Sequence, residues 1–400
     1  MGSTTASPVP FTDPTQPRLY STSQSPSLDA FRQTCSQQAT KTQYPHASTI
    51  QNNIPIYNLP PYGTLTPQEK KDLQDEWYAV LLHGPGVFVT KNLYSDHVLL
   101  DDVNAVFRSI IAEEKETMTS HGDHFAGAGK NDRIWNAFSK HGLADPRSFL
   151  KYYSNPYLGL IAASWLGPGY RITAQVNNVK PGAAAQVSHR DYHLGFMSAE
   201  TCSQIPRAMQ VSSQFLTLQG AVAHIDVPME SGPTRLLPFS QTFAEGYMAY
   251  RLPEFNDYFL KNYVSLPLAQ GDGLFFNPAL FHAAGTNQSQ DIERMANLLQ
   301  ISSAFGKPME SIDAIPLVEA VWDQLLAVFQ SQGTTDAVKA FVEAVGEGYA
   351  FPTNLDRNPP QSDSMAPKCE QDVLWDCLQR GCSMQETSGA LKAYRTATAA

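Results

Sequence analysis

Apolar and polar positions follow three different patterns along the chain, and each pattern predicts a different kind of element. From residue 66 to 116 the apolar positions recur mostly at helical spacing, with a helix start at Thr66-Pro67-Gln68-Glu69. From residue 170 to 304 the apolar runs are short, strand-like and separated by turn residues. From residue 315 to 378 helical spacing returns. The chain is therefore predicted to be mainly β with helical flanks.

The central region predicts many short strands without long helices between them, which is typical of an antiparallel sandwich or barrel. The predicted strands are 170–180, 185–196, 212–227, 233–238, 263–268, 273–276 and 295–304. Before them, residues 118–155 lack periodicity and read as a long connection or as a loop facing a substrate. After them, helices are predicted at 315–330, 335–345 and 369–378, followed by a polar tail.

Three parts of the chain are expected to differ in packing. Residues 1–50 are rich in Ser, Thr, Gln and Pro and are predicted to be disordered or loosely packed. Residues 51–310 form the predicted β domain with its N-terminal helices. Residues 311–400 form a helical C-terminal extension packed on the core, and the amphipathic segment 315–330 would suit either that core or a homodimer contact.

The composition of the chain limits the classes of function that it can have. Hydrophobic residues make up 42% of the 400 residues, which suits a globular protein. A net charge of −10 argues against nucleic-acid binding through a basic surface. No apolar run approaches the ~20 residues that a membrane span needs. The five cysteines are scattered and odd in number, which favours reduced thiols and a cytoplasmic location.

A short motif, His-x-Asp, is the first candidate for chemistry. On a strand, residues i and i+2 point to the same face, so the imidazole and the carboxylate project together. Such a pair supplies two of the three ligands of a facial non-haem iron site. The chain holds three such pairs: His121/Asp123 in a Gly-rich stretch, His189/Asp191, and His224/Asp226 in a strand-like run.

His282 and Arg294 are the candidates for completing such a site. His282 ends the apolar run that follows the Gly271-Asp272-Gly273 turn, a position where a single histidine is more often structural. A hairpin would place Arg294 near His282, pointing into the same cavity. A buried arginine needs an anionic partner, and a dicarboxylate would supply one through bidentate pairing.

The order of these parts resembles the phytanoyl-CoA dioxygenase family of iron(II)/2-oxoglutarate oxygenases, and most closely its fungal specialised-metabolite branch. The succession runs from Gln186-x-x-His189-x-Asp191 through Ser231-Gly-Pro-Thr234-Arg and Gly-Asp to His282 and Arg294, and the resemblance covers roughly residues 75–305. It departs from the family where Ser231 replaces a usual Asn, and where Pro238-Phe239-Ser240-Gln241 replaces Pro-Gly-Ser-His.

The resemblance implies a double-stranded β-helix, the cupin-like jelly roll, with iron in its mouth. It implies that His189, Asp191 and His282 bind Fe(II). It also implies that Gln186 holds the C1 end of 2-oxoglutarate, and that Thr234 and Arg294 hold its C5 carboxylate. These three positions match the family pattern in this sequence.

The expected activity is oxidation of a C–H bond of a small metabolite with O2 and 2-oxoglutarate, by hydroxylation, desaturation or oxidative cyclisation, in secondary metabolism or amino-acid modification. Candidate substrate contacts are Arg133, Trp135, Tyr192, His193 and Phe196. Two alternatives stay open: a cupin-type metal enzyme that does not use 2-oxoglutarate, and a metal-free jelly-roll binding protein.

Overall fold

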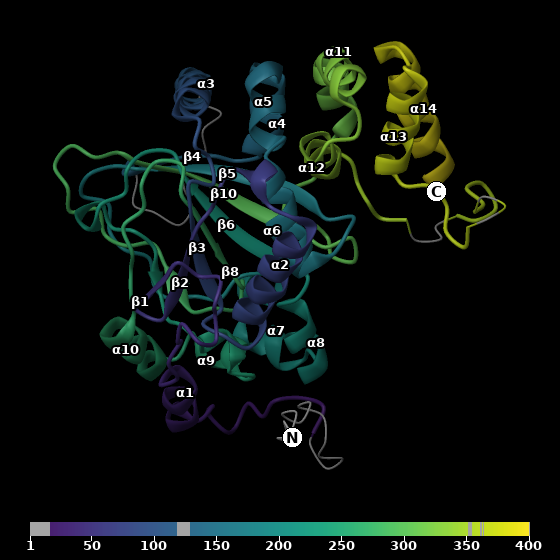
Figure 1. Ribbon diagram of the computed structural model, residues 1–400. Helices are drawn as coiled ribbons and strands as arrows, with labels where there is room; N and C mark the ends of the chain where they lie inside the picture. Colours follow the sequence, from purple (N-terminus) through teal and green to yellow (C-terminus); the bar gives the residue numbers. More distant parts are fainter. Residues whose placement is uncertain (1–16, 118–128, 351–353, 361, 363, 400) are drawn as a thin grey trace.

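An eight-stranded sheet forms the centre of the protein (Figure 1). The structure is a computed structural model that describes residues 17–117, 129–350, 354–360, 362 and 364–399. The strand order is β1-β2-β3-β8-β6-β10-β5-β4, and all neighbours are antiparallel except β2 and β3. The strands are β1 Thr49–Gln51, β2 Ile54–Asn58, β3 Val87–Lys91, β4 Asn131–Ile134, β5 Arg171–Val179, β6 Thr217–Ala223, β8 Gly273–Phe276 and β10 Arg294–Ser302.

A second, shorter layer contains β7 (Arg235–Leu236) paired with β9 (His282–Ala283). Single bridges extend it on both sides, because Leu236 pairs with Val264 and His282 pairs with His189. In chain order the eight inner segments are β5, 185–191, β6, β7, 264–268, β8, β9 and β10. The first, third, sixth and eighth lie in the large sheet and the others in the short layer. This alternation is the topology of a double-stranded β-helix, so the predicted jelly roll is confirmed.

Helices cover the outer face of the large sheet (Figure 1). Alternate residues of β5 and β10, such as Ile172, Val176 and Leu299, point away from the short layer into one hydrophobic core shared with these helices. The predicted capping box at Thr66 is present and starts α2. The helices of this side are α2 Pro67–Leu82, α3 His97–Glu116, α4 Ala137–Ala144, α5 Pro146–Tyr153 and α6 Pro156–Leu166.

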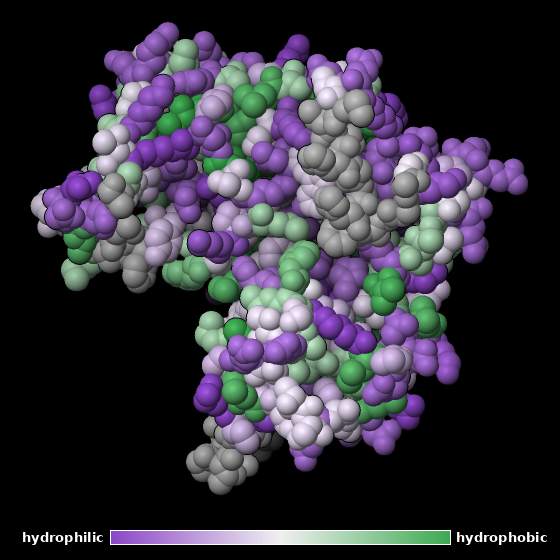
Figure 2. All heavy atoms as spheres, turned by 180° about the vertical axis from the view of Figure 1, so that it is seen from behind, coloured by the Kyte–Doolittle hydropathy of each residue, from purple (hydrophilic) through white to green (hydrophobic). Residues whose placement is uncertain are grey.

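The C-terminal helices continue the same helical layer. They are α11 Ala314–Gln332, α12 Asp336–Val345, α13 Glu370–Arg380 and α14 Met384–Thr398. α11 packs on α4, α5, α12 and α14, so the apolar face predicted at 315–330 is covered within this chain. Figure 2, seen from behind, shows this end of the protein overhanging a broad notch beside the main body. None of the described helices has the length and apolar composition to cross a membrane.

Aromatic residues build a second core beneath the short layer. Three short helices contribute buried residues to it: α7 Ala199–Ser203, α9 Gly246–Ala249 and α10 Pro253–Asn262. A fourth, α8 (Arg207–Ser213), adjoins α7 through a hydrogen bond from Gln210 to the carbonyl of Cys202. Helix α1 (Leu28–Cys35) docks here through Phe31, which is fully buried and contacts Phe243 and Phe281. The expectation of a loosely packed segment over residues 1–50 therefore does not hold for α1, because Phe31, together with Leu28 and Cys35, packs into this core.

Other elements also differ from the expectation. The described part of 118–155 holds β4, α4 and α5 rather than an irregular connection. The polar tail forms α14, which starts with a capping box at Ser383. The strand predicted over 185–196 is reduced to a bridge at His189, and residues 193–196 form a 3-10 helix. Further 3-10 helices lie at Tyr62–Thr64, Met229–Ser231 and Ser240–Thr242.

Candidate metal centre

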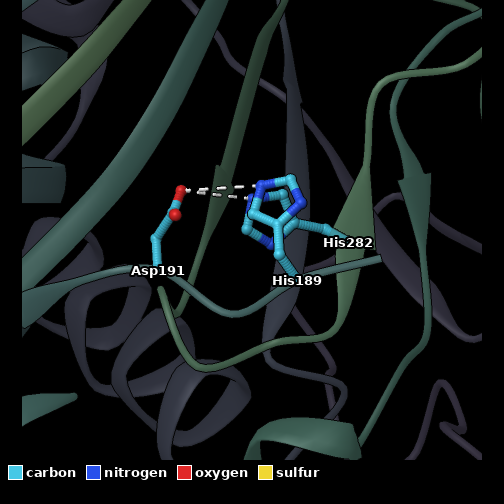
Figure 3. Close-up of side chains that lie close together, drawn as sticks. All are labelled: His189, Asp191 and His282. Atoms are coloured by element: carbon cyan, nitrogen blue, oxygen red, sulfur yellow. Dashed lines mark ion pairs between the residues drawn. The ribbon is translucent and has the colours of Figure 1, made fainter. Parts of the chain in front are cut away.

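Three side chains converge between the two layers: His189, Asp191 and His282 (Figure 3). Their ligand atoms all lie within 4.8 Å of one another. Asp191 Oδ2 is 3.5 Å from Nε2 of His282 and 3.9 Å from Nε2 of His189. Reciprocal backbone hydrogen bonds of 2.9 and 3.1 Å between the two histidines hold the imidazoles side by side. The short layer therefore fixes the position of all three groups.

The hydrogen bonds of the two imidazoles leave one nitrogen of each facing Asp191. His189 Nδ1 lies 2.9 Å from the carbonyl of Val187, and His282 Nδ1 lies 2.8 Å from the carbonyl of Leu280. A carbonyl only accepts, so each Nδ1 carries the proton and each Nε2 keeps its lone pair. Two neutral imidazoles and a carboxylate form the facial donor set of non-haem iron(II) sites, so the residues fit this metal.

Asp191 is held by contacts on both its side chain and its backbone. Gln219 Nε2 donates to Oδ2 at 2.7 Å, and the hydroxyl of Tyr247 donates to the backbone carbonyl at 2.7 Å. Burial alone raises the pKa of Asp191, but His189, His282 and the Gln219 hydrogen bond outweigh it and hold the pKa below its usual range. The carboxylate is therefore ionised and ready to bind a cation. Burial and the nearby His282 lower the pKa of His189, which keeps this imidazole neutral.

Arg190, between the two candidate ligands in sequence, is among the residues that line the cavity, but its guanidinium contacts groups below the short layer. Its guanidinium is fully buried, donates to the carbonyls of Ser240 and Phe243, and lies 5.2 Å from the ring of Tyr247. Gly246 packs directly against it, and a Cβ there would lie 1.8 Å from Arg190 Cζ. This anchor ties the segment that carries His189 and Asp191 to the aromatic core below it.

A cavity of about 560 Å³ opens beside the three side chains and lies between the two layers. Gln186, Thr234 and Arg294 all line it. Gln186 Oε1 accepts a hydrogen bond from the backbone N–H of Ala284 at 3.2 Å, which places this side chain beside β9. The structure thus brings the three predicted co-substrate residues into one cavity with the three predicted metal ligands.

Among these residues, Arg294 gives the clearest indication of the kind of ligand that the cavity would bind. It is 8% exposed, and none of the carboxylates in the described part of the chain pairs with its guanidinium. Burial lowers its pKa to about 10, which still leaves it charged at neutral pH. An unpaired buried cation is costly and is stabilised by an anionic ligand. The hairpin predicted between His282 and Arg294 is wrong, because β9 and β10 lie in opposite layers, although both face this cavity.

The predicted substrate contacts divide into two groups. Arg133 and Phe196 line the cavity, and Arg133 Nη1 donates to Gln175 Oε1 at 2.8 Å. Trp135, Tyr192 and His193 are not among the residues that line this cavity, and their contact with substrate stays a prediction. Trp135 lies beneath the Arg133 guanidinium, 5.0 Å away. Tyr192 still has extended backbone, and a 3-10 helix begins at His193.

The rival pair His224/Asp226 has a structural role. His224 is completely buried on the helical side of the sheet, where Nδ1 contacts Asn104 at 2.7 Å and Nε2 contacts Tyr152 at 3.0 Å. Asp226 is exposed and accepts a hydrogen bond from the backbone of Gln270. With both ring nitrogens engaged, His224 has none left for a metal. The pair His121/Asp123 lies outside the described residues.

Two buried histidines make the stability of the fold depend on pH. Burial lowers the pKa of His224 to about 3 and that of His141 to about 4. The unfolded chain, in which a histidine titrates near 6.5, therefore binds more protons below that pH than the folded chain does. We expect the free energy of unfolding to fall between pH 6.5 and 4, by about 1.4 kcal/mol per pH unit for each histidine.

Urea midpoints at pH 7, 6 and 5 would measure this effect. His141→Gln should remove about half of the pH dependence, whereas the same change at the exposed His83 should leave it intact. A pH dependence that survives unchanged in His141→Gln would contradict the assignment.

Gln219 and Tyr247 were missed in the sequence. The strand pattern around Gln219 shows a polar residue between apolar neighbours, which marks it as facing the cavity but not as a partner of Asp191. Tyr247 comes from α9, 56 residues after Asp191, and no local pattern connects the two.

A jelly roll with two imidazoles and one carboxylate at its mouth, beside a buried arginine that lacks an anion, defines the class of non-haem iron oxygenases. The chain belongs to the phytanoyl-CoA dioxygenase family, which matches residues 60–296. It is accordingly an Fe(II)/2-oxoglutarate-dependent oxygenase that uses O2.

Solved structures with partial similarity include two enzymes of nogalamycin biosynthesis. The non-haem α-ketoglutarate-dependent carbocyclase SnoK is 20% identical, with a TM-score of 0.42 over 60% of this chain and 85% of SnoK. The epimerase SnoN is 17% identical, with a TM-score of 0.38 over 58% and 84% of the two chains. The structure of SnoN in complex with Fe3+, α-ketoglutarate and nogalamycin RO is 16% identical in sequence, with a TM-score of 0.39 over 61% of this chain and 93% of SnoN. TM-scores below 0.5 establish neither a shared fold nor a shared function. No curated protein matched the sequence.

Proposed function

We propose that His189, Asp191 and His282 hold Fe(II), and that Arg294, Thr234 and Gln186 hold 2-oxoglutarate. The observation that carries the proposal is that one cavity holds the His189, Asp191 and His282 side chains, arranged as metal ligands, together with the buried guanidinium of Arg294, which pairs with none of the described carboxylates. Arg294 and Thr234 would take the C5 carboxylate, and Gln186, beside β9, would take the C1 end.

The chain's own groups position and protect the reacting molecules. Bound iron with 2-oxoglutarate and O2 supplies an oxidant strong enough to attack a C–H bond. The backbone bonds of His189 and His282 keep both Nε2 atoms aimed at one point. Gln219 and Tyr247 orient Asp191, and Arg190 holds the backbone between the ligands. Both layers of the jelly roll enclose the cavity, which limits the access of water.

The proposed reaction is oxidation of a small metabolite by hydroxylation, desaturation or oxidative cyclisation, in specialised metabolism or amino-acid modification. A cavity of about 560 Å³ suits a small or medium-sized molecule. Arg133 and Phe196 lie where such a molecule would sit. The five cysteines are all unpaired, which supports a cytoplasmic location.

Anaerobic titration of the metal-free protein with iron(II), and then with 2-oxoglutarate, tests the proposal directly. We expect the weak visible charge-transfer band of an iron-bound 2-oxo acid, and we expect His189→Ala to abolish it. Iron binding without the band would indicate a metal enzyme that does not use 2-oxoglutarate. Absence of iron binding would indicate a metal-free jelly-roll binding protein.

A further inference from the structure

Two exposed apolar side chains mark the opening of the cavity. Among the described residues that line it, all are buried or half-buried except Val187 and Phe196, which are 72% and 54% exposed. A lining residue that is also exposed lies where the cavity meets solvent. Val187 and Phe196 therefore form the outer edge of the cavity, and we call them the apolar rim.

The apolar rim lies beside the candidate metal ligands. Val187 precedes His189 by two residues, and its carbonyl accepts the hydrogen bond from His189 Nδ1. Phe196 ends the 3-10 helix that starts two residues after Asp191. A molecule in contact with the rim would therefore reach from solvent toward the point at which the metal would bind.

Hydrogen bonds hold the backbone on both sides of Phe196. The guanidinium of Arg251 donates to the carbonyls of Gly195 and Met197, the residues immediately before and after Phe196. The hydroxyl of Tyr250 donates to the same carbonyl of Gly195 at 2.9 Å. The surrounding structure thus fixes the position of Phe196, although its side chain is exposed.

The ring of Phe196 also has a buried support. Tyr192 is 3% exposed, and its ring meets that of Phe196 at 88°, with the ring centroids 6.3 Å apart. Single exposed apolar residues are common on protein surfaces. An aromatic ring that is held in place at the mouth of a cavity differs from them, because it is ordered before a ligand arrives and binding to it costs little conformational entropy.

The volume of the cavity gives a further reason for a ligand to reach the rim. 2-Oxoglutarate would occupy the part of the cavity of about 560 Å³ that contains Arg294 and Thr234. A medium-sized substrate would have only the remainder, so part of it would extend past the metal ligands to the opening. Contact with the rim would remove apolar surface of both molecules from water, which favours binding.

We propose that the apolar rim binds the hydrophobic framework of the substrate, and that Arg251 positions Phe196 for this contact. This rests on the proposed function, because the rim adjoins the cavity in which iron and 2-oxoglutarate would bind. The substrate class is a medium-sized metabolite with a continuous apolar surface. A free amino acid would gain little from the rim, because its charged groups need water or polar partners.

Binding of the uncharged naphthalene dye prodan, whose emission shifts to the blue when it leaves water, tests the proposal on the metal-free protein. Phe196→Ser should weaken prodan binding about ten-fold and Val187→Ser about three-fold, because each removes apolar surface that the dye would cover. Phe305→Ser and Val98→Ser are the matched controls, at positions that are 75% and 72% exposed and do not line the cavity. Both should keep the wild-type affinity.

A double-mutant cycle tests the role of Arg251. Arg251→Met should weaken prodan binding in the wild-type background and have no further effect in Phe196→Ser, because its contribution acts through Phe196. An equal loss in both backgrounds would overturn the positioning role of Arg251.

Unchanged affinity in Phe196→Ser, an equal loss in Phe305→Ser, or absence of prodan binding by the wild type would overturn the proposal. A wild-type dimer in light scattering that becomes a monomer in Phe196→Ser would also overturn it, since the rim would then join two copies of this chain. The dye measurement requires neither metal nor 2-oxoglutarate. Its outcome is therefore independent of the iron titration that tests the proposed function.

Discussion

Arg294→Met is expected to weaken the binding of 2-oxoglutarate by about 100-fold or more, without loss of the fold. Removing one partner of a buried, hydrogen-bonded charge pair typically costs 2–5 kcal/mol, which corresponds to a factor of about 30 to several thousand. In the free protein the same change removes a buried cation that has no carboxylate partner among the described residues. Its melting temperature should therefore stay the same or rise.

Two measurements separate these effects. Titration of the charge-transfer band gives the affinity for 2-oxoglutarate, and thermal unfolding without ligand gives the stability. Arg147→Met, at an exposed position on α5, serves as the matched control and should change neither. Retention of wild-type affinity in Arg294→Met would refute the assignment of this residue to the co-substrate.

Asp191→Asn should lower the affinity for iron(II) by at least about 100-fold and reduce 2-oxoglutarate turnover accordingly. Asparagine keeps the size of the side chain and an oxygen that accepts from Gln219, but it removes the negative charge that attracts the cation. Changes at groups that merely support metal ligands already cost 10–100-fold, so loss of a ligand charge should exceed that range.

Metal content after dialysis and the turnover of 2-oxoglutarate would measure this loss. The rival motif provides the control, because Asp226→Asn changes the same residue type in the same sequence context at an exposed position. Iron affinity within ten-fold of the wild type in Asp191→Asn, or an equal loss in Asp226→Asn, would disprove the assignment of the metal centre.

Local patterns predicted the regular elements well. The capping box at Thr66 and the strand periodicity of β10 are properties of neighbouring residues, so they are visible in the sequence. The 185–191 segment was harder, because it joins the short layer through isolated contacts such as the bridge from His189 to His282. The same-side placement of His189 and Asp191 survives even without a regular strand, because the extended chain alternates its side chains up to residue 191.

The candidate site was predicted less completely. His189, Asp191 and Arg294 were found through their order along the chain. Gln219 was missed because its role depends on a contact across the cavity. Tyr192 and His193 were chosen only because they follow Asp191 in the sequence, and neither is among the residues that line the cavity. What the sequence lacked in each case was the packing of distant segments against one another.

The contact between Gly246 and Arg190 constrains how this protein can vary over evolutionary time. Gly246 is not among the residues that line the cavity, yet any side chain there would collide with the guanidinium that anchors the segment between His189 and Asp191. A single mutation at position 246 should therefore impair the metal centre, as a mutation of one of its ligands would. A larger residue at position 246 is therefore expected to be tolerated only together with a residue shorter than Arg190.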